Sequence, residues 1–220
     1  MTKDGGVFYE GQMPLDDDAI GKSYYFDFTY FDPDRSCHFA ADAGTGRIIK
    51  ARHTPKAPQS FSSEVFAEGF GQPTSLRAIG SLIYIVDAST GAIWELDANT
   101  KARRLVCNIP RAWWIDYDSQ GQLAVMTTDR WVHTIEPASG AVARPAWTPI
   151  PSPDSVIREW VQLSVDRNGS CGPVDGVVLC SSTGSGNTDL YHYTADGSRH
   201  ILLYKHPGRV VVGSSLNVTE

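Results

Sequence analysis

The chain has 220 residues, of which 41% are hydrophobic and 20% are charged, and its formal net charge is −6. A chain of this length can bury a substantial core, and this composition is typical of a globular protein. The negative charge argues against a broad surface for nucleic acid or anionic membranes, because both need an excess of lysine and arginine.

Segment 1–22 contains no apolar stretch of the kind found in a secretory signal. No run approaches the roughly 18 apolar residues of a membrane-spanning helix. The cysteines are too few and too irregularly spaced for a disulfide framework. We therefore expect synthesis in a cytoplasm, with reduced thiols at every cysteine. These are Cys37, Cys107, Cys171 and Cys180.

Strand signals follow one another along the rest of the chain. Short apolar or β-branched runs alternate with clusters of Gly, Asp, Asn and Ser, which is the pattern of antiparallel strands joined by tight turns. The first unit is expected at 24–30, 38–42, 48–52 and 64–67, and the second at 74–79, 82–87, 93–97 and 104–109. The third is expected at 114–117, 123–127, 131–136 and 141–147, and the fourth at 161–165, 177–181, 190–194 and 200–204.

One phrase recurs in these units. An apolar strand ends in Asp, a short turn with Gly follows, and a second strand begins, as in 37–52 and 81–97. Looser copies occupy 123–136 and 177–194. The copies recur at intervals of about 40 to 55 residues, close to the length of a four-stranded propeller blade. The comparable positions are Asp42, Asp87, Thr128 and Ser182.

The sequence therefore predicts an all-β, propeller-like fold with four recognisable four-stranded blades. Their boundaries are expected at 23–68, 69–110, 111–150 and 151–206. Segment 207–220 adds an incomplete fifth strand unit, and 6–10 in the N-terminal segment is a candidate closing strand. Three closures stay open: a four-blade ring with tails, a five-blade ring with one thin blade, or an arc completed by another chain.

The second unit carries a family resemblance. It reads Gly-Gln-Pro-Thr-Ser-Leu at 71–76 and Leu-Ile-Tyr-Ile-Val-Asp at 82–87, followed by Ile93. This is similar to the repeats of NHL-type and gluconolactonase-like (senescence-marker-type) propellers, and 39–49 matches the second half of the phrase. The third and fourth units depart from it at Thr128 and Ser182. The resemblance concerns blades, and a shared fold does not define a function.

The resemblance to gluconolactonase-like enzymes implies a divalent metal such as calcium at the axis, held by Glu, Asn and Asp side chains. The candidates here are Asp27, Glu68 and Asp116. The inner strands offer Ser164 and no Asn where the family would place one, so the metal site is not carried over. We therefore expect no cofactor, and a metal-dependent hydrolase is kept as an alternative.

Two histidines suggest ligands but have a simpler explanation. His133 and His192 fall at the same third-strand position of their units, where the first two units have Lys50 and Glu95. A position that accepts all three residue types is expected to be a polar, partly exposed face of each blade. Histidines on adjacent blades would also lie too far apart to share a metal, whose bond to nitrogen is about 2 Å.

Aromatic residues mark the entrances to the third and fourth inner strands. Exposed tryptophan with nearby arginine is typical of surfaces that recognise proteins or stack on sugars. The alternative is that these tryptophans pack between blades. The candidates are Trp113, Trp114 and Trp160, with Arg111 and Arg158 preceding them.

The leading functional hypothesis is a non-enzymatic structural or protein-interaction module with a protein partner, and no catalytic residue is assigned. The unpaired strand unit around Val210, Val211 and Val212 suggests completion by another subunit through strand addition. A virion or tail component is one setting that fits such an assembly subunit. The alternatives are a gluconolactonase-like hydrolase and a carbohydrate-binding propeller that takes glycans on its tryptophans.

Overall fold

The computed structural model describes residues 26–30, 37–54, 60–149, 157–183 and 188–206. Within these ranges all regular secondary structure is β, in sixteen strands. None of the described residues belongs to a helix long and apolar enough to cross a membrane.

Consecutive strands pair antiparallel into four sheets of four strands each. The first two sheets are β1 (Phe26–Tyr30), β2 (Cys37–Asp42), β3 (Arg47–Thr54) and β4 (Ser60–Glu68), then β5 (Pro73–Ile79), β6 (Leu82–Asp87), β7 (Ala92–Asp97) and β8 (Arg103–Asn108). The other two are β9 (Ala112–Tyr117), β10 (Leu123–Thr127), β11 (Val132–Glu136) and β12 (Ala141–Trp147), then β13 (Ile157–Asp166), β14 (Gly176–Thr183), β15 (Thr188–Tyr193) and β16 (His200–His206).

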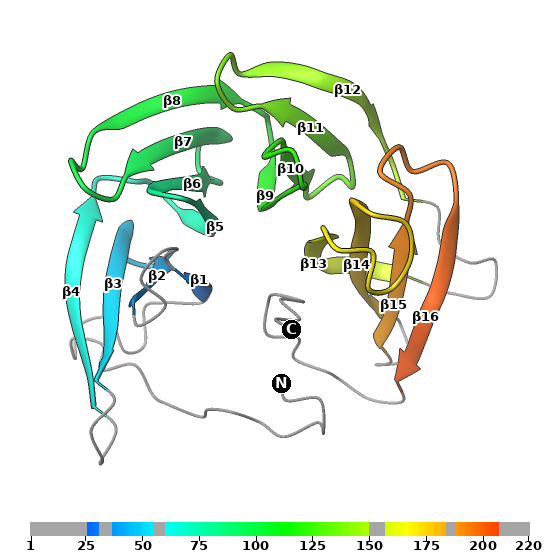
Figure 1. The fold of residues 1–220 in the computed structure, drawn as a ribbon, viewed down its shortest axis with the longest axis horizontal. Helices are drawn as coiled ribbons and strands as arrows, with labels where there is room; N and C mark the ends of the chain where they lie inside the picture. The colour runs from blue at the N-terminus through cyan, green and yellow to red at the C-terminus, as the bar shows by residue number, and fades with distance from the viewer. Residues whose placement is uncertain (1–25, 31–36, 55–59, 150–156, 184–187, 207–220) are drawn as a thin grey trace.

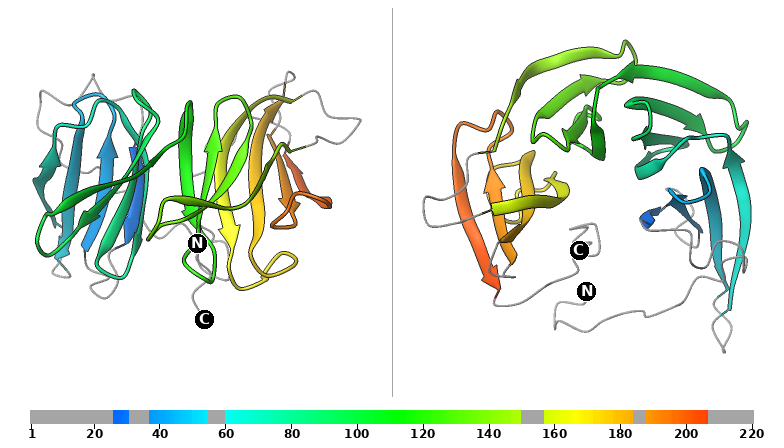
Figure 2. Two further views of the ribbon diagram at one scale, coloured as in Figure 1. Left: turned by 90° about the horizontal axis from the view of Figure 1, so that it is seen from above. Right: turned by 180° about the vertical axis from the view of Figure 1, so that it is seen from behind.

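The sheets are arranged as blades around a common axis (Figures 1 and 2). The first strand of each sheet faces the axis, and β4, β8, β12 and β16 lie on the outer rim (Figure 1). The described strands form an arc that runs from β1 at one end to β13 at the other. The predicted propeller-like fold of four four-stranded units is thus confirmed. The proposed strands in 207–220 and 6–10 fall outside the described residues.

The inner strands of the second and third sheets are buried on both faces because each of these sheets packs between two others. In the second sheet, β5 and β6 have almost no exposed residue, although their sequences are not strictly alternating. The outer strand β8 is exposed along its first half. Near-continuous apolar strands are expected wherever both faces of a sheet are covered.

Three clusters of buried side chains fill the spaces between neighbouring sheets. Between the first and second sheets, Phe39 and Ile48 pack with Leu76 and Ile85. Phe39 also meets Phe66 edge-on, with ring centroids 4.9 Å apart. Burying one such side chain contributes about 1.5–3 kcal/mol, so these clusters are the main attraction between blades.

In the second sheet, the repeated Asp and Gly fasten the hairpin to the connections between blades. The Asp87 carboxylate accepts hydrogen bonds from the backbone N–H groups of Gly71 and Gln72, both at 2.9 Å. Gly91 has a φ of 75°, and its carbonyl accepts the Ile109 N–H at 2.8 Å. A Cβ atom at Gly91 would lie 2.4 Å from the Ile109 oxygen, so the close approach requires glycine. The repeated phrase is therefore part of the scaffold.

The third sheet builds the corresponding turn differently. Sequence comparison placed Thr128 at the Asp position, whereas the residue that closes the turn is Thr127. Its Oγ1 accepts the Trp131 N–H at 2.9 Å, whereas the Asp42 and Asp87 carboxylates accept N–H groups of their own loops. The Thr128 N–H instead donates to the carbonyl of Arg111 at 2.9 Å. The loop is one residue shorter here, and this shifts the alignment by one position.

Candidate functional site

The first strands near the axis are joined by one buried carboxylate. Asp116 Oδ1 on β9 lies 2.9 Å from Arg167 Nη1 and 3.4 Å from Arg77 Nε on β5. Its Oδ2 accepts the Val165 N–H at 2.8 Å and the Ser164 hydroxyl at 3.2 Å. One side chain thereby connects the second, third and fourth sheets. Buried charges are tolerated only when paired and hydrogen-bonded in this way.

This network bears on the metal candidates. Both Asp116 oxygens already accept hydrogen bonds from groups that a cation would have to displace, so Asp116 does not fit a metal ligand. Glu68 ends the outer strand β4, with its side chain 73% exposed and 4.0 Å from Arg47. Asp27 pairs with Ala41 in the first sheet, and its side chain lies outside the described part. The fold thus separates Glu68 from Asp116, and no group of three or more ligand-type side chains gathers among the residues that the structure describes.

The tryptophan candidates belong to the first strands of the third and fourth sheets, Trp113 and Trp114 near the start of β9 and Trp160 inside β13. Trp113 and Trp114 are half-buried at the entrance to β9, with ring centroids 6.0 Å apart. Trp114 packs against the cluster between the third and fourth sheets, which favours the inter-blade packing alternative for this residue. Trp160 and Arg158 belong to β13, and their side chains lie outside the described part.

A more exposed group occupies the adjacent end of the third sheet. We call Arg111, Asp129, Arg130 and Trp131 the third-sheet tip. Arg111 is 67% exposed, and its Nη1 lies 3.1 Å from Asp129 Oδ2. Trp131 is 44% exposed. Sequence reasoning missed Trp131 because it stands at the start of a third strand, whereas the search concerned the entrances to inner strands. An aromatic residue directly after a Thr-Asp-Arg turn was the available signal.

The aligned residues Lys50, Glu95 and His133 are polar and half-buried, as predicted. In the third sheet, however, the residue that pairs as Glu95 does in the second is Thr134, so His133 stands one position away. The prediction is wrong for His192, which is only 2% exposed. Its ring is covered by Gly172 and Gly176, where an added Cβ would lie 2.6 Å and 2.1 Å from the imidazole. Its Nε2 faces Asp166 Oδ2 at 3.6 Å. The missing glycine side chains make room for the imidazole, and the alignment could not show this.

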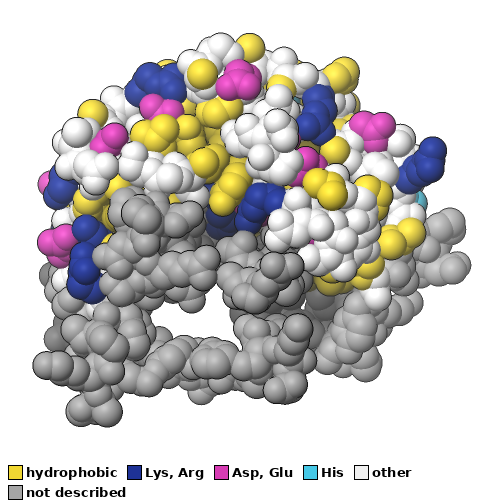
Figure 3. All heavy atoms as spheres, in the orientation of Figure 1, with side chains coloured by type: hydrophobic (Ala, Val, Ile, Leu, Met, Phe, Trp, Pro, Cys, Tyr) yellow, Lys and Arg dark blue, Asp and Glu magenta, His cyan; other side chains and the backbone are white. Residues whose placement is uncertain are grey.

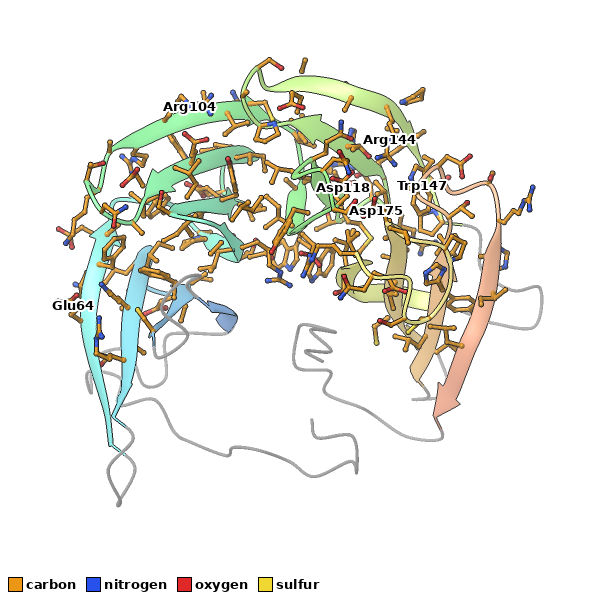
Figure 4. The ribbon with its side chains drawn as sticks, in the orientation of Figure 1. Glu64, Arg104, Asp118, Arg144, Trp147 and Asp175 are labelled. Atoms are coloured by element: carbon orange, nitrogen blue, oxygen red, sulfur yellow. The ribbon has the colours of Figure 1, made fainter. Side chains whose placement is uncertain are left out.

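A second polar cluster fastens the third sheet to the fourth (Figure 4). Arg144 on β12 donates to Asp118 Oδ2 at 2.9 Å. Asp175, just before β14, accepts the N–H of Ser119 at 2.6 Å and its hydroxyl at 2.7 Å. Asp118, Arg144 and Asp175 line a small pocket at the seam. Each charged group has a partner on the neighbouring strand or sheet, so the seam is a structural junction.

Arg104 connects the second and third sheets through a similar set of polar contacts. Its guanidinium is held by Glu95 at 2.7 Å and donates to the carbonyl of Pro137 at 3.0 Å. Figure 3 shows basic and acidic side chains interspersed over this face of the molecule. The polar groups of the scaffold thus mostly satisfy one another.

The fold and these contacts define a β-propeller-like scaffold. No family model and no curated protein matches the chain. Among solved structures it is similar to hydrazine synthase of Kuenenia stuttgartiensis, at 13% identity and a TM-score of 0.57, over 92% of this chain and 51% of that one. It is also similar to a chain in the crystal structure of a nidogen/laminin complex, at 13% identity and a TM-score of 0.55, over 82% of this chain and 62% of that one.

These similarities show the fold alone, because both identities are 13%. The chain spans about half of the first structure, 51%, and 62% of the second. Neither comparison distinguishes an NHL-type from a gluconolactonase-like propeller, so that resemblance stays at the level of the sequence.

Proposed function

We propose that this protein is a non-enzymatic protein-interaction module, built as a rigid propeller-like scaffold that presents its loops to a partner. The observation that carries the proposal is the network at Asp116. Its oxygens contact two arginines and accept hydrogen bonds from the Ser164 hydroxyl and the Val165 N–H of the fourth sheet. This inner-strand carboxylate therefore has a structural role. Recognition then falls to the exposed turns.

The similar nidogen/laminin chain supports the proposal in a limited way. Its title names a complex of two proteins, so a scaffold of this shape is compatible with binding a protein surface. We further propose that the chain is a subunit of a larger assembly, such as a virion or tail component. In that assembly Val210, Val211 and Val212 would pair with a strand of another subunit.

The test is the native mass of the chain purified with a small tag from its own host. A stoichiometric complex well above the 24.1 kDa of the single chain is expected. Val211→Pro should release the partner if strand addition holds it, because proline removes a backbone donor from the ladder. Val142→Pro on the exposed strand β12 serves as the matched control. A monomer that hydrolyses lactones would overturn the proposal, and a complex unaffected by Val211→Pro would remove strand addition alone.

A further inference from the structure

Two arginines of the third-sheet tip adopt the left-handed backbone conformation. The φ of Arg111 is 64° and that of Arg130 is 77°. Residues with a side chain rarely occupy this region because Cβ crowds the backbone, and glycine is the usual choice there. The tip therefore holds two arginines where the backbone favours glycine.

Arg111 occupies the third position of a four-residue turn. The Ala112 N–H donates to the Ile109 carbonyl at 3.1 Å and closes the turn. Pro110 stands second, and the positive φ follows at Arg111. This is the pattern of a type II turn, whose third position strongly favours Gly or Asn.

Arg130 ends a three-residue hairpin loop. Its N–H donates to the Thr127 carbonyl at 3.0 Å, and the Thr127 N–H donates to the Trp131 carbonyl at 2.9 Å. The left-handed residue of such loops is usually glycine. The first and second sheets do have glycine at the last loop position, Gly46 and Gly91, with φ of 70° and 75°.

The other two strained side chains have an internal explanation. Lys101 has a φ of 61°, and its Nζ lies 4.8 Å from the centre of the Phe66 ring. Asp175 also has a φ of 61°, and its carboxylate binds Ser119 across the sheet seam. In both cases the strained residue makes a contact that holds the scaffold.

Within the described part of the chain, the side chains of the tip arginines contact no other sheet. The Arg111 guanidinium pairs with the exposed Asp129 of the same tip. The side chain of Arg130 is exposed and has no hydrogen-bond or ion-pair partner within the described part of the chain. Non-glycine residues persist in strained conformations mainly where their side chains have a role. Here that role lies outside the scaffold.

We infer that the third-sheet tip is a recognition surface for a protein segment with a carboxylate beside an apolar side chain. A guanidinium only donates hydrogen bonds and matches the two oxygens of a carboxylate. Trp131, 44% exposed beside the arginines, offers the apolar contact. Neutral sugars would need acceptors as well as donors, and the Asp129 carboxylate is engaged by Arg111. The inference rests on the proposed function and names the surface that would carry it.

The experiment selects random dodecapeptides displayed on phage against the immobilised protein. Enriched peptides should carry Asp or Glu next to an aliphatic or aromatic residue. Arg130→Gly and Trp131→Ala should each weaken their binding about tenfold or more. Arg199→Ala, at an exposed arginine of the fourth sheet, should leave binding unchanged. Arg130→Gly should also unfold at an equal or higher temperature than the wild type, because it removes backbone strain.

Several results would overturn the inference. Peptides that bind Arg130→Gly and the wild type equally would do so, and so would enrichment without acidic residues or no enrichment at all. Binding to a glycan array that is lost in Trp131→Ala would replace the protein partner with a carbohydrate. A native complex that persists in both tip variants would leave the proposed function standing and remove only this surface. Absence of any complex for the wild type would instead count against the proposed function.

Discussion

The carboxylate of Asp116 and the guanidinium of Arg167 lie 2.9 Å apart, joining the strand β9 to the end of β13. Arg77 approaches the same carboxylate from β5, at 3.4 Å. The side chains of Asp116 and Arg77 are only 2% and 6% exposed. One negative charge therefore pairs with two positive ones where three sheets converge, and its removal would take this carboxylate partner from both guanidinium groups.

Replacing Asp116 should consequently be among the most damaging single changes in the chain. We expect Asp116→Ala to lower the free energy of unfolding by about 3–5 kcal/mol, the typical effect of breaking a buried ion pair. The exposed pair at Arg111 gives the control, since Asp129→Ala should cost less than about 1 kcal/mol. Urea unfolding followed by tryptophan fluorescence measures both. If both variants lost the same free energy of unfolding, the buried network would contribute no more to stability than the exposed ion pair.

The sequence predicted the sixteen strands because each blade repeats the same local chemistry. Alternating apolar runs and turns rich in Asp and Gly depend on neighbours a few residues apart, so the hairpin at Asp87 and Gly91 could be recognised without the fold. Blade-to-blade contacts are different. The pairing of Asp116 with Arg77 depends on how two sheets pack, and no local pattern contains that distance. In the sequence, the one indication of this pairing was Arg77, a charged residue between the apolar residues of β5.

His192 and the third-sheet tip show the same limit. The repeat alignment predicted a partly exposed His192, but its burial follows from the glycines at 172 and 176, which lie outside the aligned position. At the tip, Arg130 replaces a glycine of the first two sheets, and its significance depends on a backbone angle. Sequence comparison shows that an arginine replaces the glycine, but it does not show that the backbone at this arginine is strained.

Substitutions of two glycines in the second sheet would measure the cost of backbone strain separately from the cost of a steric clash. Gly91 and Gly80 have positive φ values of 75° and 58°. An added Cβ meets the Ile109 oxygen at 2.4 Å in Gly91 and meets nothing within 4 Å in Gly80. We expect Gly80→Ala to cost about 1 kcal/mol from strain alone, and Gly91→Ala to cost about 1–3 kcal/mol more. Thermal unfolding of both variants measures the difference, and equal costs would mean that the inter-blade connection yields without penalty.

Acid should weaken the hairpin at Asp87. Burial raises the pKa of Asp87, but the hydrogen bonds from Ser89, Gly71 and Gln72 outweigh it, so the pKa lies below its usual value. The folded state then binds fewer protons than the unfolded state, and this stabilisation is present above the ordinary aspartate pKa. It is lost as the pH falls through the lowered value.

The corresponding variant is Asp87→Asn, which keeps one acceptor oxygen but has no charge. Its free energy of unfolding should be about 1–2 kcal/mol below that of the wild type at neutral pH. The gap should narrow as the pH falls below about 4, near the aspartate pKa of the unfolded chain. Chemical unfolding measured at several pH values tests this. A gap that stays constant down to the lowest pH at which the protein folds would mean that the Asp87 charge contributes nothing.

The fourth sheet offers a test of burial that is independent of stability. Burial, together with the nearby Asp189 carboxylate, raises the pKa of Cys180 to about 11. Since only the thiolate reacts, about 0.1% of this thiol would be reactive at pH 8, and its side chain is also covered. Cys171 is half-buried, so a thiol reagent reaches it more easily. Alkylation of the native protein followed by peptide mapping should label Cys171 well before Cys180, and denaturant should abolish the difference. Rapid labelling of Cys180 in the native state would mean that the fourth sheet opens readily or that its face is uncovered.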